Sequence, residues 1–304
     1  MFAPIVLFVY NRPKNTKNVL DSLSKCKFAK KSDLFIFSDA AKNSKSESNV
    51  IEVRKIINDK CWNKLFNSIK IVENENNKGL AKSVISGVTK IINIYSKVIV
   101  IEDDNKVSVD FLDYMNRGLE FYENNKCIGM IGGYSAPIKF PKEYKFDVYK
   151  MGRGSSYAWA TWKDRWDKVD WEVKDYAVFK KNKKLRHEFD YYGNDRSTML
   201  DNQMKGKIDS WAIRFGYSMF KHNMFAILPV VTRVENVGFD GSGVHNVAGE
   251  SKFINHIPKE IKPANFVNVE VDERIRKEYI KKFNPSLKTK IKRKLKSVLN
   301  IKTL

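Results

Sequence analysis

Cysteine and histidine are scarce in this chain, which has 3 cysteines and 4 histidines among 304 residues. The cysteines are Cys26, Cys61 and Cys127, and their odd number and wide spacing match neither a zinc-binding pattern nor a disulfide framework. Such cysteine usage is typical of a protein that works in a reducing compartment.

Long apolar runs are also missing. No stretch of 18 consecutive apolar residues occurs, so the sequence predicts no segment that spans a bilayer. Residues 1–4 lead directly into a strand pattern without a basic region or a cleavage site, so we expect no signal peptide. The hydrophobic content of 42% is ordinary for a soluble globular protein. These features together favour a cytoplasmic protein.

The sequence motifs of glycine-rich phosphate-binding loops are missing after the first predicted strand. Neither G-x-G-x-x-G nor G-x-x-x-x-G-K-[ST] follows the first predicted strand, which argues against a dinucleotide oxidoreductase and a P-loop NTPase. Asn11, Arg12 and Pro13 stand at that place instead. A proline has no N–H group to offer a phosphate, so a sugar nucleotidyltransferase is the weaker alternative.

Acidic residues are absent from residues 281–304, which hold nine lysines and arginines, within a chain of formal net charge +21. After Pro285, one side of the predicted helix carries Leu287, Ile291, Leu295, Val298 and Leu299. Lysines occupy the other side, and a basic amphipathic helix of this kind lies on anionic membrane surfaces. A solvated helix packed on its own domain is the alternative.

Strands and helices alternate along the first hundred residues. Apolar patterns predict strands at residues 4–10, 33–37, 68–72 and 98–101, a helix after Pro13, a loop at 42–49, a helix at about 50–60 and a helix that opens at Gly79. This order implies an α/β fold with a mainly parallel sheet and helices on both faces. Beyond it we expect a helix at 111–121, a strand at 128–131, a helical insertion at 174–208, a helix at 209–220, a strand at 225–231 and a glycine-rich loop at 236–245.

Three tryptophans recur at helical spacing. Trp159, Trp162 and Trp166 are predicted to share one face of a helix and to belong to the core, and Asp164 and Arg165 to be surface charges of that helix.

Three carboxylates follow the most apolar of these strands. Residues 98–101 are four consecutive β-branched residues, typical of a strand buried on both faces, and Glu102, Asp103 and Asp104 come directly after them. Like charges about 4 Å apart repel by about 1 kcal/mol even in water, so a cation is expected among them. Ligands of open α/β sheets bind at the carboxyl ends of the strands, and a hard divalent cation carrying a phosphate ester meets both conditions. A solvated acidic turn is the alternative.

Other polar residues follow neighbouring strands. Asn11 and Arg12 come after the first strand, and Arg12 could pair with a phosphate or a base carbonyl. Asp39 comes after the second strand, where it could accept a hydrogen bond from a uracil-type N–H or act as a turn residue. We expect all of them at one edge of the sheet.

Several short segments follow one another in a set order: residues 11–13, 38–39, 77–81 and 102–104, a Trp-rich segment and an Asp-x-Trp segment at 209–211. In this order and spacing the chain resembles nucleotide-sugar glycosyltransferases of the GT-A fold. The likeness covers roughly residues 3–245. It is to bacterial polysaccharide enzymes related to glycosyltransferase family 2 and to the N-acetylglucosaminyltransferase I group.

The resemblance implies roles for the acidic triplet and its neighbours. Asp104 resembles the ligand of a Mn²⁺ or Mg²⁺ ion that bridges the donor diphosphate, Asp103 a contact to the ribose or donor sugar, and Glu102 a supporting residue. The chain has Glu-Asp-Asp in place of the common Asp-x-Asp, which leaves the division of roles among the three open. The remaining nucleotide-sugar contacts implied by the resemblance are Asn11, Arg12, Asp39, Lys78 and Arg153.

Asp209 is the candidate catalytic base. An inverting transfer needs a carboxylate that takes the proton of the acceptor hydroxyl, and the Asp-x-Trp region of the related enzymes contains that base. Helix N-cap is the alternative role for Asp209, because it stands at a predicted helix start.

Two further residues belong to glycine-containing segments. Arg153 lies between Gly152 and Gly154 and could hold an acceptor or phosphate group; the same stretch of the related enzymes lies near the donor sugar and the acceptor. His245 follows Gly243, and many related transferases complete the metal shell with a C-terminal histidine, so His245 is a candidate metal ligand.

The sequence therefore predicts a nucleotide-sugar-binding half at 1–131, an acceptor-binding and catalytic half at 132–250, and an extension with the basic tail at 251–304. By resemblance, the chain is expected to be a metal-dependent inverting hexosyl- or N-acetylhexosaminyl-transferase, with a UDP-linked donor and a glycan or lipid-linked acceptor, in bacterial surface polysaccharide synthesis such as capsule or lipopolysaccharide. It would lie at the inner face of the cytoplasmic membrane. A non-catalytic polyanion- or nucleic-acid-binding protein is the alternative, although the acidic triplet argues against nucleic acid as a partner.

Overall fold

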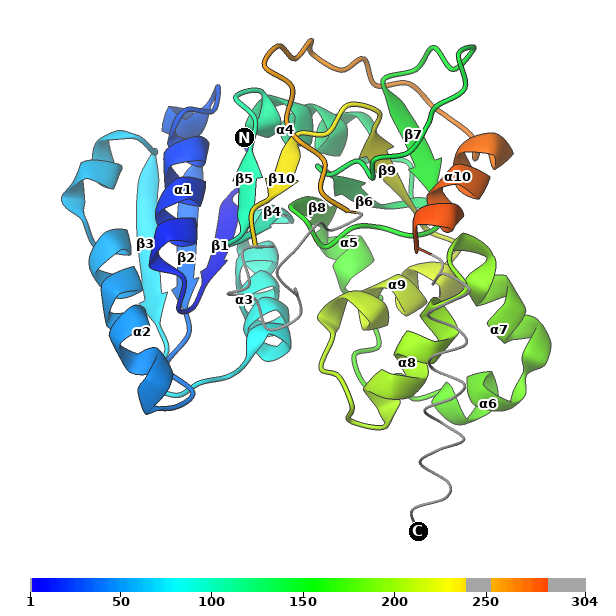
Figure 1. Ribbon diagram of the computed structural model, residues 1–304, viewed down its shortest axis with the longest axis horizontal. Coiled ribbons are helices and arrows are strands. Elements are labelled where there is room, and N and C mark those ends of the chain that lie inside the picture. Colours follow the sequence, from blue (N-terminus) through cyan, green and yellow to red (C-terminus); the bar gives the residue numbers. More distant parts are fainter. Residues whose placement is uncertain (1, 239–252, 284–304) are drawn as a thin grey trace.

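The computed structural model describes residues 2–238 and 253–283 (Figure 1). The predicted α/β fold is confirmed: an eight-stranded sheet crosses the molecule, with helices packed around it. The strands of this sheet are β1 (Ile5–Val9), β2 (Asp33–Ser38), β3 (Ser68–Glu73), β4 (Lys97–Glu102), β6 (Ile128–Gly132), β7 (Val148–Met151), β8 (Trp159–Trp162) and β9 (Phe225–Pro229). A separate antiparallel pair consists of β5 (Asn105–Val107) and β10 (Val234–Asn236).

The helices connect and cover these strands. They are α1 (Pro13–Ser24), α2 (Ser44–Ile57), α3 (Leu80–Tyr95), α4 (Phe111–Phe121), α5 (Lys163–Trp166), α6 (Tyr176–Lys181), α7 (Lys183–Phe189), α8 (Arg196–Met204), α9 (Trp211–Lys221) and α10 (Glu273–Phe283). Within the described residues, no helix has the length and apolar character needed to cross a membrane.

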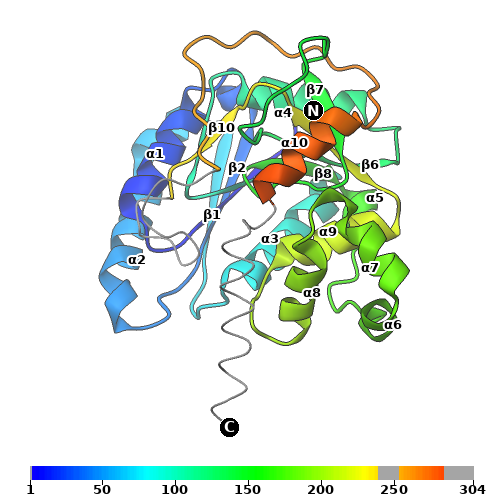
Figure 2. The same cartoon turned by 45° about the vertical axis from the view of Figure 1, so that its right-hand side comes forward.

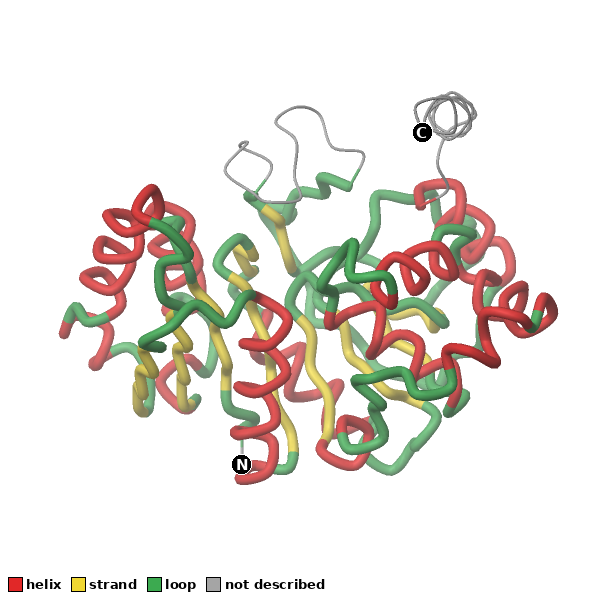
Figure 3. Tube along the Cα trace, turned by 90° about the horizontal axis from the view of Figure 1, so that it is seen from below, coloured by secondary structure: helices red, strands yellow, loops and turns green. Residues whose placement is uncertain are grey.

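The strand order is β3-β2-β1-β4-β8-β6-β9-β7, and Figure 3 shows the strands as a twisted row through the centre of the molecule. β3, β2, β1 and β4 are mutually parallel, as predicted from the alternation of strands and helices. β8 then runs antiparallel between β4 and β6, β9 is parallel to β6, and β7 is antiparallel at the edge. The sheet is therefore mainly but not wholly parallel.

The main core extends along the whole eight-stranded sheet, and its first four strands show how the sequence forms it. Every residue of β1 is buried, and residues 98–101 of β4 are buried on both faces, as their β-branched run predicts. The apolar stripe of α1, Val19, Leu20 and Leu23, packs into the same core.

The expected insertion at 174–208 is helical. Together with α9 it forms the helical lobe, α6 to α9, which gathers below the sheet in Figure 1 and beside it in Figure 2. The lobe has its own small core, made by Val173, Phe179, Phe189, Leu200, Ile213 and Tyr217. α9 also contacts α3, which joins the lobe to the first half of the chain.

The predicted tryptophan helix is wrong. Trp159 and Trp162 lie on strand β8, and only Trp166 lies on a helix, the one-turn α5. Trp159 stacks on Trp166 and Trp211, whereas the Trp162 indole donates to the Leu119 carbonyl. A strand buried on both faces places large aromatics in two directions, so the spacing alone did not distinguish strand from helix. Their assignment to the core is confirmed.

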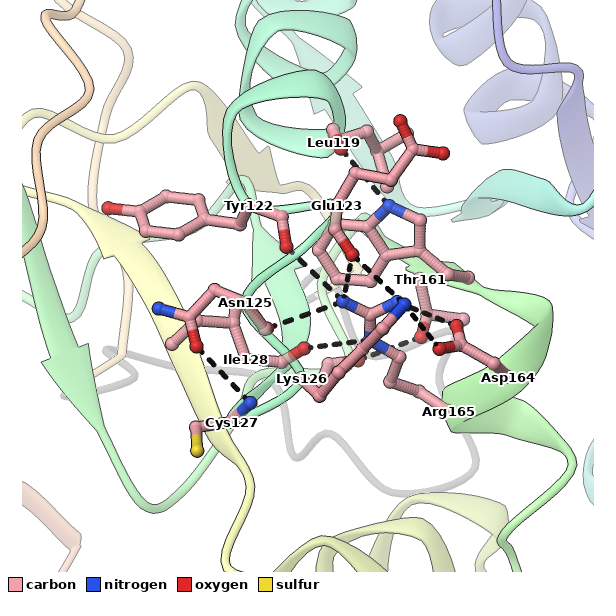
Figure 4. Close-up of polar contacts among 12 residues, drawn as sticks. Leu119, Tyr122, Glu123, Asn125, Lys126, Cys127, Ile128, Thr161, Asp164 and Arg165 are labelled. Carbon is pink, nitrogen blue, oxygen red and sulfur yellow. Dashed lines mark hydrogen bonds and ion pairs between the residues drawn. The ribbon is translucent and has the colours of Figure 1, made fainter.

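Arg165 is also not a surface charge. Its side chain is 1% exposed, and its guanidinium donates to the carbonyls of Tyr122, Glu123, Asn125 and Ile128, as Figure 4 shows. The same guanidinium pairs with Asp164 at 2.6 Å and lies 4.2 Å from the Trp162 ring centroid. Arg165 therefore connects the chain between α4 and β6 to α5, the short helix that follows β8.

The loop predicted at 42–49 is mostly helix, because α2 begins at Ser44. Asn43 caps it with a capping box in which the backbone N–H of Asn43 also donates to Ser46 Oγ. The polar composition of this segment therefore marks a helix start rather than a long loop. α4 has the predicted bounds, and Gly79 precedes α3 with a positive φ of 75°.

Candidate functional site

The strand order reverses between β1 and β4. The chain moves from β1 to β2 and β3 in one direction along the sheet and returns to β4 on the other side of β1. In open α/β sheets, ligands bind in the crevice outside the carboxyl ends of the strands at such a reversal. Arg12 follows β1 and the acidic triplet ends and follows β4, so the fold brings these two sequence segments to the same crevice.

Arg12 joins the two aspartates. Its Nη1 lies 3.0 Å from Asp104 Oδ2 and 3.5 Å from Asp103 Oδ1. The backbone N–H of Tyr10, at the end of β1, donates to Asp103 Oδ2 at 3.3 Å. Both aspartates are buried. The predicted cation among the carboxylates is therefore supplied in part by the protein itself.

Asn105 and Gly238 support Asp104 from the other side. Asn105 is fully buried; its Nδ2 donates to Asp104 Oδ1 at 2.5 Å, and its Oδ1 accepts from Ala158 N. The β5–β10 pair brings Gly238 so close that a Cβ there would lie 2.6 Å from Asp104 Oδ2. Asn236 lies beside Gly238, and its buried Nδ2 has no hydrogen-bond partner among the described residues. A side-chain donor is thus held near the Asp104 carboxylate.

Two carboxyls of the triplet, those of Glu102 and Asp103, hold protons more tightly than usual. Burial and the neighbouring Asp104 raise the pKa of Asp103 to about 7, with Arg12 acting in the opposite direction. Burial, Asp104 and Asp103 raise the pKa of Glu102 to about 8, and a hydrogen bond from the Trp211 side chain partly offsets this. When all three carboxyls are ionised, their charge exceeds the one positive charge of Arg12, so a further cation in place of the protons would be stabilised there.

The carboxylates of the site fit a hard dication only if other ligands come from outside the protein. Among the described residues there is no group of three His, Cys, Asp or Glu side chains placed to hold a metal, and Arg12 and Asn105 already engage the two oxygens of Asp104. Mg²⁺ commonly needs one or two carboxylates, with phosphate oxygens and waters as its other ligands. Asp103 and Asp104 match that need, so these residues fit a dication that arrives with a diphosphate rather than one held by the protein alone.

Asp39 organises a loop. Its Oδ1 accepts from the backbone N–H groups of Ala40 and Lys78 and from Asn74 Nδ2, and its Oδ2 accepts from Lys78 N and Gly79 N. These four donors make five hydrogen bonds, because Lys78 N contacts both oxygens, and they fill most of the lone-pair positions of a carboxylate. Asp39 thus links the end of β2 to the start of α3. Base recognition by its side chain stays a prediction.

The other nucleotide-site candidates lie at the same edge. Asn11 precedes Arg12 and is half-buried. Lys78 is exposed, and its backbone is held by Asp39. The structure thus brings the segments after β1, β2 and β4 together, as the sequence predicts.

A cavity of about 220 Å³ lies next to the triplet; we call it the Arg153–Arg196 cavity. Trp211 and Tyr157 line it. Trp211 also hydrogen-bonds to Glu102, and the charges of Asp104 and Glu102, together with burial, raise the pKa of Tyr157 to about 12. These two aromatic residues therefore lie between the cavity and the carboxylates.

The structure does not bring Asp209 into this cavity. Its side chain is 57% exposed and pairs with Arg214 at 2.9 Å. Ser210, not Asp209, caps α9, since its Oγ accepts from Ile213 N. The alternative of Asp209 as the N-cap is therefore wrong, and its role as a base stays a prediction. His245 and the tail after Pro285 lie outside the described residues.

Sequence reasoning missed Asn105, Tyr157, Arg196, Asn236 and Gly238 as parts of the site. Asn105 directly follows the triplet and could have been included for that reason. The other four approach from distant segments through β10, β8 and α8, and no local pattern indicates those meetings.

No family model and no curated protein matches this chain. Among solved structures, a crystal structure of S. aureus TarS is similar, with a TM-score of 0.44 and 11% identity over 79% of this chain and 37% of that chain. Another, of S. aureus TarS 1–349 in complex with UDP, has a TM-score of 0.45 and 12% identity over 77% of this chain and 60% of that chain. The chain thus spans less than two thirds of either TarS chain.

Proposed function

We propose that this protein is an inverting glycosyltransferase of the GT-A type. It would transfer a hexosyl or N-acetylhexosaminyl group from a nucleotide sugar, UDP-linked, to a glycan or lipid-linked acceptor in surface polysaccharide synthesis. One observation carries the proposal: Arg12, Asp103 and Asp104 meet at the reversal of strand order, beside a cavity lined by Trp211. The order of the sequence motifs, which resembles the GT-A pattern, supports it independently.

The donor diphosphate would lie at the Arg12 end of the site. In this arrangement Arg12 turns from the aspartates toward a phosphate oxygen, to which a guanidinium can donate two hydrogen bonds. Asn236 Nδ2 offers a further donor. A bound Mn²⁺ or Mg²⁺ ion, held by Asp104 and the diphosphate, would stabilise the negative charge of the leaving group as a Lewis acid. Asp103, next to it, would orient the ribose or the donor sugar.

The test of the site is nucleotide binding by Asp104→Ala. We expect Mn²⁺ to strengthen UDP binding to the wild type and the variant to lose that effect, with affinity lower by about tenfold or more, about 1.4 kcal/mol per factor of ten. Isothermal titration calorimetry with and without Mn²⁺ measures both. Asp113→Ala is the matched control, because the Asp113 and Asp104 side chains are 13% and 11% exposed and each pairs with a cation. Equal UDP affinity of Asp104→Ala and wild type in Mn²⁺ would refute the metal role.

The proposed base is Asp209, and Glu102 is its rival inside the site. Positioned proton transfer contributes about 10²–10⁴-fold to rate, so Asp209→Asn should lower kcat by about 10²-fold or more while UDP affinity stays as in wild type. If Glu102→Gln shows that loss and Asp209→Asn keeps wild-type turnover, the base is Glu102. The raised pKa of Glu102, about 8, would then appear as an acidic limb in the pH–rate profile.

A further inference from the structure

Two arginines line the Arg153–Arg196 cavity. The cavity is otherwise lined mainly by apolar and aromatic side chains, among them Met130, Trp211 and Met219. Because Trp211 also hydrogen-bonds to Glu102, the cavity adjoins the carboxylates at which transfer is proposed. Its volume of about 220 Å³ is below the roughly 300–1,000 Å³ of drug-sized ligand sites. It therefore fits one small unit of a longer acceptor.

Arg196 is a buried cation with incomplete compensation. It is 2% exposed, donates to the carbonyls of Phe189 and Gly216, and lies 4.1 Å from the Phe189 ring centroid. Among the described residues it forms no ion pair. Burial and the nearby charge of Arg153 lower the pKa of Arg196 to about 9. The charged form of Arg196 is therefore less stable in the folded protein than in water.

Arg153 is held by a carboxylate that a ligand can replace. Its Nη1 and Nη2 donate to Asp195 Oδ1 and Oδ2 at 2.6 and 3.1 Å. This two-bond geometry is the one by which arginine binds carboxylates and phosphates in general. Asp195 pairs with Arg153, and the charges of Asp195 and Asp190 only partly offset the effect of burial on Arg196, so an anion bound in the cavity would compensate the rest of the Arg196 charge.

We infer that the Arg153–Arg196 cavity binds the acidic group of an anionic acceptor sugar, a phosphate or a carboxylate. The inference rests on the proposed function, since it names the acceptor class of that site. The donor diphosphate has its own arginine, Arg12, at the strand reversal, so the two anionic groups are recognised by different residues. Arg153, a nucleotide-sugar contact by sequence resemblance, thereby becomes an acceptor contact.

The test uses the full chain and simple sugars without nucleotide. Calorimetry compares glucose 6-phosphate, glucuronate and uncharged glucose. We expect at least one acidic sugar to bind at least about tenfold more tightly than glucose, and the tighter of the two identifies the group as phosphate or carboxylate. Equal affinity for all three sugars would overturn the inference. UDP binding is titrated separately, so a chain that binds acidic sugars but no UDP contradicts the proposed function alone.

Two variants with opposite expected effects separate binding from a structural role. Arg153→Gln should weaken acidic-sugar binding by about tenfold or more, whereas Asp195→Asn should strengthen it, because a competing carboxylate is removed. Arg186→Gln is the matched control, since Arg186 forms a similar two-bond pair with Asp201 in the helical lobe, away from the cavity, and should bind as wild type. If Arg153→Gln and Asp195→Asn both weaken binding, or Arg153→Gln weakens UDP binding instead, the inference is wrong.

Discussion

Arg165 shows how much one buried guanidinium can hold. It donates to four backbone carbonyls between Tyr122 and Ile128 (Figure 4). We expect Arg165→Met to lower the free energy of unfolding by about 3 kcal/mol, because the buried carbonyl oxygens lose their hydrogen-bond donor. Urea denaturation measures the change. Lys126→Gln removes the exposed partner of Asp164 and should cost less than about 1 kcal/mol. Equal effects would contradict this account.

The raised pKa values at the acidic triplet predict a pH dependence of stability. In the folded protein the pKa is about 7 for Asp103 and about 8 for Glu102, above the values of about 4 in unfolded chains. The folded state then binds more protons between about pH 4 and 8, so these groups make the free energy of unfolding fall as pH rises through that window.

Asp103→Asn should therefore reduce the loss of stability between pH 5 and pH 8, measured by urea denaturation without added metal or nucleotide. Asp33→Asn is the control. The hydrogen bonds that Asp33 accepts from Ser68, Asn67 and Tyr95 lower its pKa, so the stability it contributes is lost only below pH 5. An unchanged difference between pH 5 and pH 8 in Asp103→Asn would count against the buried acidic cluster.

At the residue scale, the sequence predicts well which side chains lie at the site. It predicts less well which hydrogen bonds each of them forms. Arg12 and the triplet meet because parallel strands end at the same sheet edge, a rule of the fold. Four N–H groups donate to Asp39, and Ser210 rather than Asp209 caps α9. Those outcomes depend on the exact backbone path, which side-chain identity does not specify.

At the scale of elements, the β5–β10 pair sets the position of Asp104. Val237 N donates to the Asp104 carbonyl at 2.8 Å, and Gly238 leaves no space for a side chain beside the carboxylate. Gly238→Ala should therefore displace Asp104 and weaken UDP binding in Mn²⁺ by about tenfold or more, measured by calorimetry.

Gly206→Ala is the control for this substitution. Gly206 has a φ of 66° and open space around it, so alanine there should cost about 1 kcal/mol of stability without changing UDP affinity. Wild-type UDP binding by Gly238→Ala would show that the close approach of β10 is not needed to place Asp104.

The predicted elements were most accurate where one periodic pattern dominated. The buried run of β4 and the helical stripe of α4 are local signals, and both elements are confirmed. Strand β8 was missed because its four residues, Trp-Ala-Thr-Trp, are buried on both faces and show no alternation. Its place between β4 and β6 depends on pairing across many residues, which no short window contains.

At the scale of the whole molecule, the charge of +21 and the basic C-terminal segment favour an anionic surface as partner. We propose that deleting residues 284–304 abolishes sedimentation with vesicles of anionic phospholipid, because each basic residue near such a surface contributes about 1 kcal/mol. Transfer to soluble acceptors should persist. Neutral phosphatidylcholine vesicles and duplex DNA are the controls for charge and for a general polyanion binder. Unchanged sedimentation after the deletion would refute membrane attachment.

The mainly parallel architecture was predictable because the order of elements nearly determines it. The proposed boundaries at residues 131 and 250 remain predictions. Tyr122 donates to the Val267 carbonyl, and Phe266 packs 5.0 Å from Tyr114, so the described part of the extension covers α4 in the first half. Such contacts, more than a hundred residues apart, leave no trace in local composition.

Strand β8 makes the two halves of the chain depend on each other for folding. Because it hydrogen-bonds to β4 on one side and to β6 on the other, the first and second halves share one continuous backbone ladder. A polypeptide ending at residue 131 would leave β4 as an uncovered edge, which is prone to pair with other chains and to aggregate. The two halves are therefore expected to melt together in a single cooperative transition, and any closure over substrate to come from loops rather than from a hinge between domains.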